Sequence, residues 1–129
     1  MISLQHKRIF ISGAAAGMGY SVARLAAAAG AQVYATDLVS DGLENLAQDG
    51  VHTALLDVTI HKDVQAYFAD QPDFDGIVNM AGWVHHGTLT QTSIENWHRS
   101  FAVNLDSMFY VLHAAIPGLI RKGGGSIVN

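Results

Sequence analysis

Short apolar runs alternate along the chain with segments whose apolar residues keep helical spacing. Patterns of buried strands occupy residues 8–11, 31–36, 51–56, 77–79 and 126–128. Helical patterns occupy residues 20–29, 41–48 and 62–69. A longer helix is predicted from a Thr92-x-x-Glu95 capping box onward, with an apolar stripe at helical spacing and Pro117 kinking or ending it. Strand–helix units with short links predict one α/β domain over residues 1–129, a doubly wound parallel sheet with helices on both faces.

Composition narrows the possible functions. Half of the residues are hydrophobic and the net charge is −4, without a basic stripe, so nucleic acid is not an expected partner. The absence of cysteine excludes thiolate catalysis and suits a reducing cytosol, and the seven histidines are too scattered to predict a metal site. No signal-peptide profile is present, and no apolar run reaches the roughly 20 residues that span a bilayer. We therefore expect a cytoplasmic protein without a membrane partner.

The most informative motif is the glycine-rich stretch Ser12-Gly13-Ala14-Ala15-Ala16-Gly17-Met18-Gly19, between the first strand and the first helix. Glycines allow a pyrophosphate to approach the backbone, and the N–H groups that begin a helix attract anions. The residues predicted to bind a dinucleotide here are Gly13, Ala16, Gly17, Met18 and Gly19. Valine at Gly17 or Gly19 should block the pyrophosphate and leave the fold largely intact. The alternative is a glycine-rich turn that only closes a loop.

Two aspartates end predicted strands at the edge of the sheet where ligands bind. Asp37 lies roughly 20 residues beyond the glycine turn, where dinucleotide folds place an acid on the adenosine ribose. A carboxylate there accepts bonds from ribose hydroxyls and repels a 2′-phosphate, which predicts NAD rather than NADP. Asp57 ends the third strand. Each has a simpler interpretation, as an ordinary strand-end, turn or N-cap aspartate.

Four motifs in this order resemble the short-chain dehydrogenase/reductase family: the glycine turn, Asp57-Val58, Asn79-Met80-Ala81-Gly82 and Val103-Asn104-Leu105. The resemblance covers the whole chain and implies a Rossmann-type sheet. It places the cofactor beside Asp57, Val58, Asn79, Ala81 and Gly82. Met80 departs from the asparagine usual in the family, although contacts from the backbone remain possible there.

Asn104 is the one residue of the family's catalytic machinery that this sequence contains. The resemblance implies that it interrupts the long helix and holds a water molecule of the proton relay. The simpler alternative ties its amide to a neighbouring backbone carbonyl, since a polar group on an apolar helix face needs a partner.

Within the family, the loop from Ala81 to Thr88 is similar to that of cytosolic type-2 (R)-3-hydroxybutyrate dehydrogenases and bacterial 2-keto-3-deoxy-L-fuconate dehydrogenases. The resemblance implies hydride transfer between NAD(H) and a small hydroxy acid or sugar acid, in a homodimer or homotetramer. His85 and His86 are candidates for a pocket that binds the substrate carboxylate. Adjacent residues do not easily chelate one metal ion, so we expect no metal there.

The family's catalytic serine after the fifth strand and its Tyr-x-x-x-Lys pair are not in this sequence. The chain stops at Asn129, inside the fifth predicted strand, so we expect a dehydrogenase truncated after that strand. Apolar surface on this strand and on the long helix should then be exposed. A non-catalytic domain that binds a nucleotide or a partner remains the alternative, and a methyltransferase is a more distant one.

Overall fold

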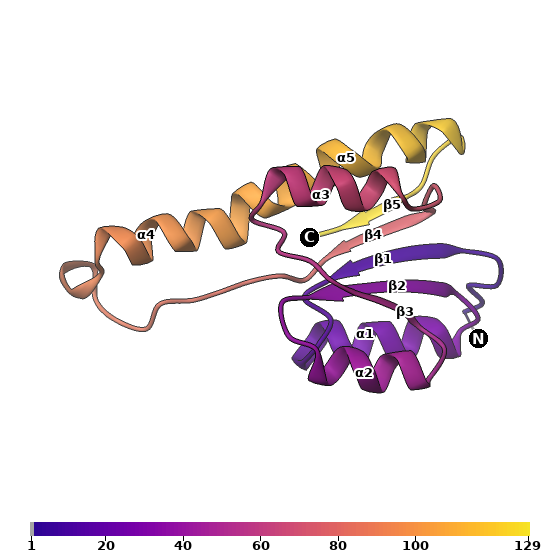
Figure 1. The fold of residues 1–129 in the computed structure, drawn as a ribbon, viewed down its shortest axis with the longest axis horizontal. Helices are drawn as coiled ribbons and strands as arrows, with labels where there is room; N and C mark the ends of the chain where they lie inside the picture. Colours follow the sequence, from indigo (N-terminus) through magenta and orange to yellow (C-terminus); the bar gives the residue numbers. More distant parts are fainter. Residues whose placement is uncertain (1) are drawn as a thin grey trace.

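A five-stranded parallel sheet forms the centre of the structure, a computed structural model that describes residues 2–129 (Figure 1). The strands are β1 (Arg8–Ser12), β2 (Gln32–Asp37), β3 (His52–Leu55), β4 (Gly76–Asn79) and β5 (Ser126–Val128). Their order is β3-β2-β1-β4-β5, so the chain leaves one edge after β3 and crosses to the other side of β1. This order confirms the predicted doubly wound sheet. It also creates a switch point between β1 and β4, where such sheets bind ligands.

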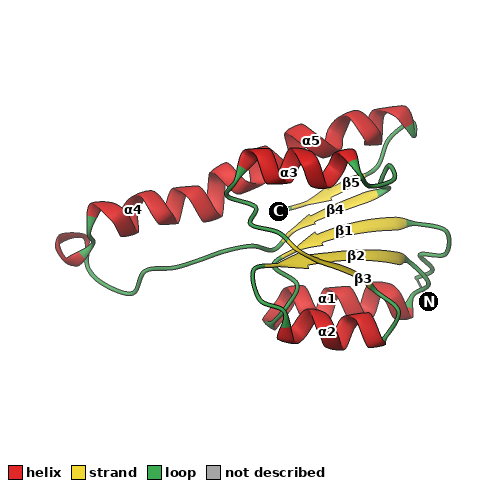
Figure 2. Ribbon diagram, in the orientation of Figure 1, coloured by secondary structure: helices red, strands yellow, loops and turns green. Residues whose placement is uncertain are grey.

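Helices cover both faces of the sheet (Figure 2). Helices α1 (Gly17–Ala28) and α2 (Asp41–Gln48) lie on one face, and α3 (His61–Ala69) and α5 (Ser107–Arg121) lie on the other. One core joins the sheet to α1 and α2 through Ile11, Ala23, Val33, Ala35, Leu43 and Leu46. The second joins it to α3 and α5 through Phe10, Val64, Phe74, Ile77, Val111 and Leu119. The sheet is therefore apolar on both faces, as its continuous hydrophobic strands require.

The long helix differs from its prediction at both ends. Helix α4 (Ile94–Phe101) has Ser93 as its N-cap, whose hydroxyl accepts from the Asn96 backbone N–H at 3.1 Å, so the capping box predicted at Thr92 is wrong. A capping box does occur four residues earlier, where Thr88 and Gln91 close the short 3₁₀ helix η1 (Leu89–Gln91). Pro117 does not end α5, which continues to Arg121. Pro117 is on the exposed side of the helix, where water can bond to the carbonyl that proline leaves unpaired.

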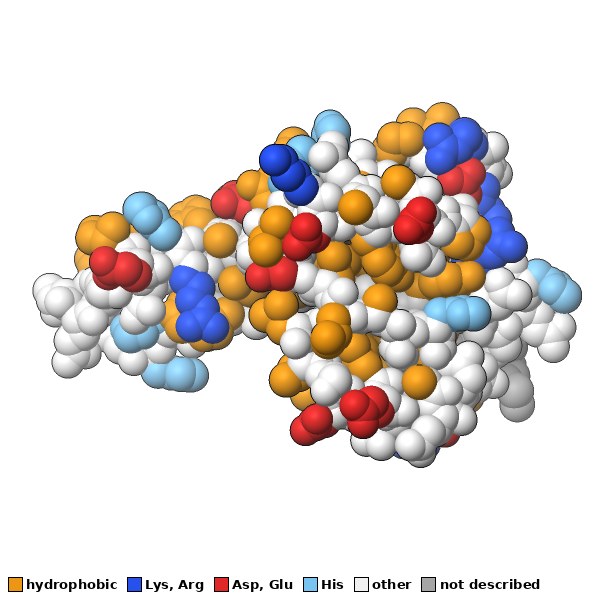
Figure 3. Space-filling view, in the orientation of Figure 1, with side chains coloured by type: hydrophobic (Ala, Val, Ile, Leu, Met, Phe, Trp, Pro, Cys, Tyr) orange, Lys and Arg blue, Asp and Glu red, His pale blue; other side chains and the backbone are white. Residues whose placement is uncertain are grey.

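Helix α4 extends away from the sheet, and much of its apolar stripe is uncovered (Figure 1). Ile94, Trp97 and Phe101 are 67%, 49% and 44% exposed, so this part of the stripe faces solvent. Hydrophobic side chains are visible along this arm (Figure 3). In β5, Ile127 and Val128 are also exposed. The predicted exposure of apolar surface on the fifth strand and the long helix is therefore confirmed.

Residues Ile94–Arg121 form one helical run of 28 residues, which is long and apolar enough to cross a membrane by length and composition alone. Helix α5, which makes up its second half, buries Val111, Ala115 and Leu119 against the sheet. That is the packing of a core helix. Polar and charged residues interrupt this segment, so it is not one of the continuous apolar runs in the sequence.

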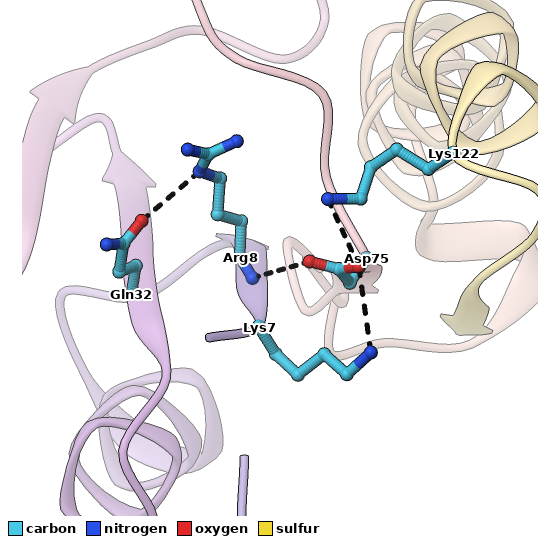
Figure 4. Close-up of polar contacts among 5 residues, drawn as sticks. All are labelled: Lys7, Arg8, Gln32, Asp75 and Lys122. Atoms are coloured by element: carbon cyan, nitrogen blue, oxygen red, sulfur yellow. Dashed lines mark hydrogen bonds and ion pairs between the residues drawn. The ribbon is translucent and has the colours of Figure 1, made fainter. Parts of the chain in front are cut away.

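A polar cluster around Asp75 lies at the end of the sheet where strands β1 and β4 begin (Figure 4). The Asp75 carboxylate accepts from the Arg8 backbone N–H at 2.9 Å and lies 3.3 Å from the Lys122 ammonium and 3.8 Å from that of Lys7. Burial by itself would raise the pKa of Asp75, but the Arg8 N–H and the two lysines outweigh it and lower that pKa. The cluster links the start of β1 to the start of β4 and to the end of α5.

Candidate functional site

A cavity of about 340 Å³ opens at the carboxyl edge of the sheet, over the switch point. It brings together most of the residues predicted to bind the cofactor, although they come from four separate parts of the sequence. The predicted residues that line it are Gly13, Ala16, Gly17, Asp37, Asp57, Val58, Ala81 and Gly82. Leu38, Leu56, Thr59, Met80 and Val103 complete the lining. Three predicted residues, Met18, Gly19 and Asn79, are not part of it.

The glycine turn has the backbone geometry of an anion site. Helix α1 begins at Gly17, no side chain caps it from Ala16, and its first turn contains no acidic residue. The first N–H groups of the helix therefore have no side-chain partner and can bond to a phosphate. Gly13 has a φ of 63°, and a Cβ there would lie 2.7 Å from the Ala81 backbone nitrogen. Only glycine lets the turn pass this close to the segment that follows β4.

The remaining two glycines of the turn have different roles. Gly17 has a φ of 57°, and a Cβ placed on it would meet no atom within 4 Å, so it would enter open space at the cavity. Gly19 is buried, and a Cβ on it would clash with the Gly13 carbonyl oxygen. Gly19 thus allows the helix to pack on its own turn. Valine at Gly19 would deform the turn, which corrects the expectation that it would leave the fold largely intact.

Asp37 is held in place at the end of β2. One carboxylate oxygen accepts from the Ala15 backbone N–H at 2.9 Å, and the other accepts from Leu38 at 2.6 Å and from Val39 at 3.3 Å. Each carboxylate oxygen has two acceptor sites, so the oxygen that accepts only from Ala15 can still receive a ribose hydroxyl. No lysine or arginine lines the cavity in the part of the chain that the structure describes.

Asp57 follows β3 and closes a local turn. Its carboxylate accepts from both the backbone N–H of Thr59, at 2.9 Å, and the hydroxyl of that residue, at 2.6 Å. This is the turn aspartate that the simpler interpretation described. The same carboxylate also lines the cavity beside Val58, so the turn presents it to a ligand.

Ser12 has a structural role that the sequence motifs did not predict. Its side chain is 1% exposed at the end of β1, and its hydroxyl oxygen accepts from the backbone N–H groups of Met80, at 3.1 Å, and Ala81, at 3.3 Å. The hydroxyl thereby joins the glycine turn to the loop after β4 across the switch point. The signal was present, because a serine at the end of an otherwise apolar strand needs a hydrogen-bond partner.

Replacing Ser12 with alanine should lower the free energy of unfolding by about 1–3 kcal/mol, because it leaves two partly buried N–H groups without their acceptor. Chemical denaturation followed by circular dichroism measures this loss. Ser12→Thr keeps the hydroxyl and is the matched control. Equal stability of the alanine and threonine variants would show that the hydroxyl does not hold the loop.

Asn104 lies in a π-helical turn, η2 (Ala102–Asp106), which interrupts the helix as the family resemblance implied. Its side-chain oxygen accepts from the Trp83 N–H at 3.1 Å, and its amide nitrogen donates to the Trp83 carbonyl at 2.6 Å. The nitrogen also donates to the Ser100 carbonyl at 2.8 Å, the contact of the simpler alternative. The residue is exposed rather than buried on the helix face. It fastens the loop after β4 to the helix, and its place in a proton relay stays a prediction.

Two of the residues absent from the cavity lining have other surroundings. Met18 has a side chain that is 76% exposed, so any contact with a cofactor would come from its backbone. The side chain of Asn79 donates to the side-chain oxygen of Asn129 at 2.8 Å, which links the ends of β4 and β5. The structure therefore directs Asn79 toward its neighbouring strand.

The two histidines are separated by the structure. His85 lines a second cavity, of about 280 Å³, between the loop after β4 and helix α4. His86 is exposed and is not among the residues that line this cavity. In the described part of the chain, no group of three or more histidine, aspartate or glutamate side chains could hold a metal ion.

Comparison with known proteins gives the family. A family model described as enoyl-(acyl carrier protein) reductase matches residues 13–129. Dehydrogenase/reductase SDR family member 6 of Rattus norvegicus is 33% identical over 98% of this chain and 52% of its own length. The chain belongs to the short-chain dehydrogenase/reductase family. This result overturns the methyltransferase alternative.

Two further relatives agree with this short-chain dehydrogenase/reductase assignment. The 2-keto-3-deoxy-L-fuconate dehydrogenase of Xanthomonas campestris is 42% identical over 98% of this chain and 43% of its own length. A short-chain type dehydrogenase/reductase from Mycobacterium ulcerans superimposes with a TM-score of 0.89 at 27% identity, over 98% of this chain and 51% of that one. The chain thus spans about half the length of these relatives. Family membership accounts for the parallel sheet and for the cavity at its carboxyl edge.

Proposed function

We propose that this chain is the cofactor half of an oxidoreductase that transfers a hydride between NAD(H) and a small hydroxy acid or sugar acid. The observation that carries the choice of NAD is the Asp37 carboxylate, which three backbone N–H groups hold beside the glycine turn. The cavity it lines has no cationic side chain, among the described residues, that could receive a 2′-phosphate. The residues present therefore fit NAD.

Each part of the cavity has a role in this proposal. The turn from Gly13 to Gly17 binds the pyrophosphate through backbone N–H groups, and Asp37 accepts bonds from the adenosine ribose. Asp57 and the Val58 backbone contact the adenine. The backbone of Ala81 and Gly82 lies beside the second ribose. When bound, the cofactor supplies or accepts the hydride, while these residues orient it and exclude water.

The substrate class rests on the loop after β4 and on the similarity to a relative that is 42% identical, a 2-keto-3-deoxy-L-fuconate dehydrogenase. A sugar acid or a compound such as (R)-3-hydroxybutyrate carries a carboxylate and a secondary hydroxyl, which suit a histidine-lined pocket. We place the enzyme in the cytoplasm as a homodimer or homotetramer. The uncovered apolar stripe of α4 supports the association.

Replacing Asp37 with serine should weaken NADH binding and strengthen NADPH binding. The repulsion between a carboxylate and a 2′-phosphate a few ångströms away is about 1–4 kcal/mol, so the ratio of the two dissociation constants should shift by roughly that free energy. Fluorescence titrations with both nucleotides measure the ratio. Asp70→Ser removes the same charge from an exposed position outside the cavity and should leave the ratio unchanged. Equal affinity of the unmodified chain for NADH and NADPH would contradict the assignment of NAD.

The second candidate function is a domain that binds a nucleotide or a partner without catalysis. It is favoured by one observation, that no tyrosine in the sequence is followed four residues later by lysine. Both candidates predict no turnover by this chain alone, so they are separated by adding a polypeptide that contains the missing pair. Turnover then supports the cofactor half, and its absence supports the non-catalytic domain.

A further inference from the structure

The cavity between the loop after β4 and helix α4 lies next to the cofactor cavity. Asn104 lines the former and its neighbour Val103 lines the latter. The remaining lining residues of the second cavity are Trp83, Val84, His85, Thr92, Asn96, Trp97 and Ser100. If the chain binds a dinucleotide as proposed, this cavity extends from the Gly82 end of the cofactor site.

Within this cavity, His85 and Asn96 form a pair. The Nδ1 atom of His85 lies 3.2 Å from the side-chain nitrogen of Asn96. An amide nitrogen only donates, so Nδ1 accepts, and the ring proton of neutral His85 is on Nε2. Asn96 is itself fixed, because its backbone N–H donates to the Ser93 hydroxyl at the start of α4.

The other ring nitrogen of His85 has no partner. Nε2 is buried and forms no hydrogen bond with any residue that the structure describes. A Cβ on Gly87 would lie 2.8 Å from this atom and 3.5 Å from the two ring carbons bonded to it, so the lack of a side chain at position 87 lets the loop pack against the Nε2 end of the ring. Buried N–H donors without an acceptor are rare, and because His85 also lines the cavity, this one is a candidate for bonding to a ligand. The acceptor that suits a neutral N–H is an oxygen atom.

We propose that Asn96 is a positioning residue that holds His85 with its proton on Nε2, so that this N–H donates to a carboxylate or hydroxyl oxygen of the substrate. The inference rests on the proposed function for the identity of the substrate. His86 has no comparable constraint in the structure, since it is exposed and makes no contact with Asn96. The assignment therefore separates the two adjacent histidines into one that contacts substrate and one that does not.

The first test determines which ring nitrogen carries the proton. Long-range ¹H–¹⁵N correlation spectra of the ¹⁵N-histidine-labelled chain distinguish the two neutral tautomers, and His85→Gln identifies the signals. We expect the Nε2–H tautomer in the unmodified chain and the Nδ1–H tautomer in Asn96→Asp, because a carboxylate only accepts.

The Asn96→Asp variant should fold, because aspartate at the third residue of α4 is favourable for the helix. Asn45→Asp makes the same change on the exposed surface of α2 and should leave His85 unchanged. An Nδ1–H tautomer in the unmodified chain, or the same tautomer in Asn96→Asp, would overturn the proposal.

The second test determines whether Nε2 meets a substrate oxygen. NADH and (R)-3-hydroxybutyrate are both reduced and cannot react with each other, so they serve together as a stable probe. We expect the hydroxy acid to shift the Nε2 resonance saturably in the NADH-bound chain and to bind about tenfold or more weakly to Asn96→Asp, a loss of about 1.4 kcal/mol. Binding of NADH without any response of His85 to the hydroxy acid would refute the donor role and leave the cofactor assignment standing. Failure to bind NADH would refute the proposed function itself, while the tautomer result would still decide the role of Asn96.

Discussion

Replacing Gly17 with valine is expected to abolish NADH binding and to lower stability only slightly. Gly17 has a φ of 57°, so a branched side chain is strained there by about 1–2 kcal/mol. The added atoms would meet no protein atom within 4 Å of the Cβ, and they would occupy the space at the cavity where the pyrophosphate is expected. Fluorescence titration with NADH measures the binding, and thermal unfolding measures the strain.

Gly50 provides the matched control for this variant. It has a φ of 82°, and a Cβ on it would also meet nothing within 4 Å, but it is not among the residues that line the cofactor cavity. Gly50→Val should therefore show similar strain and normal NADH binding. If Gly17→Val bound NADH as well as Gly50→Val does, the turn would have only a structural role.

The second expectation is that the 129-residue chain binds NADH but shows no dehydrogenase turnover. A correctly placed general acid or base contributes about 10²–10⁴-fold to the rate, and the sequence has no Tyr-x-x-x-Lys pair to supply one. Asn104 does not replace it, because a neutral amide does not exchange protons in this way. Its side chain is already bonded to Trp83 and Ser100.

The assay follows NADH formation from (R)-3-hydroxybutyrate and from 2-keto-3-deoxy-L-fuconate, with the full-length Xanthomonas campestris relative as the positive control. Turnover by the 129-residue chain above the buffer rate would show that other residues in it supply the proton transfer. Turnover only after addition of a polypeptide that contains the missing pair would support the assignment of this chain as the cofactor half.

Local patterns in the sequence determined the fold class and the location of the candidate cofactor cavity. The apolar runs gave all five strands, with bounds that differ from the structure by at most one residue at either end. Because parallel strands in a doubly wound sheet end at one edge, the glycine turn, Asp37 and Asp57 could be expected to meet there, and all three line one cavity. These features depend on residue type and spacing, which a sequence shows directly.

Helical periodicity was less informative about burial. It shows which residues share one face of a helix but not whether anything covers that face. Ile94, Trp97 and Phe101 keep the spacing of a core helix and are nevertheless exposed, because α4 extends beyond the sheet. Helix α5 buries one apolar face, formed by Val111, Ala115 and Leu119, because it lies on β4 and α3.

Only the tertiary structure showed which distant groups touch. It placed the Ser12 hydroxyl against the loop after β4 and the Gly19 backbone against the Gly13 carbonyl. It also paired His85 with Asn96, which distinguished His85 from the adjacent His86. Hydrogen bonds and close contacts of this kind depend on distances of a few tenths of an ångström between segments far apart in the chain. The sequence by itself therefore determined which segments meet at the candidate cofactor cavity, and the packing of the folded chain decided which side chains can contribute and in what orientation.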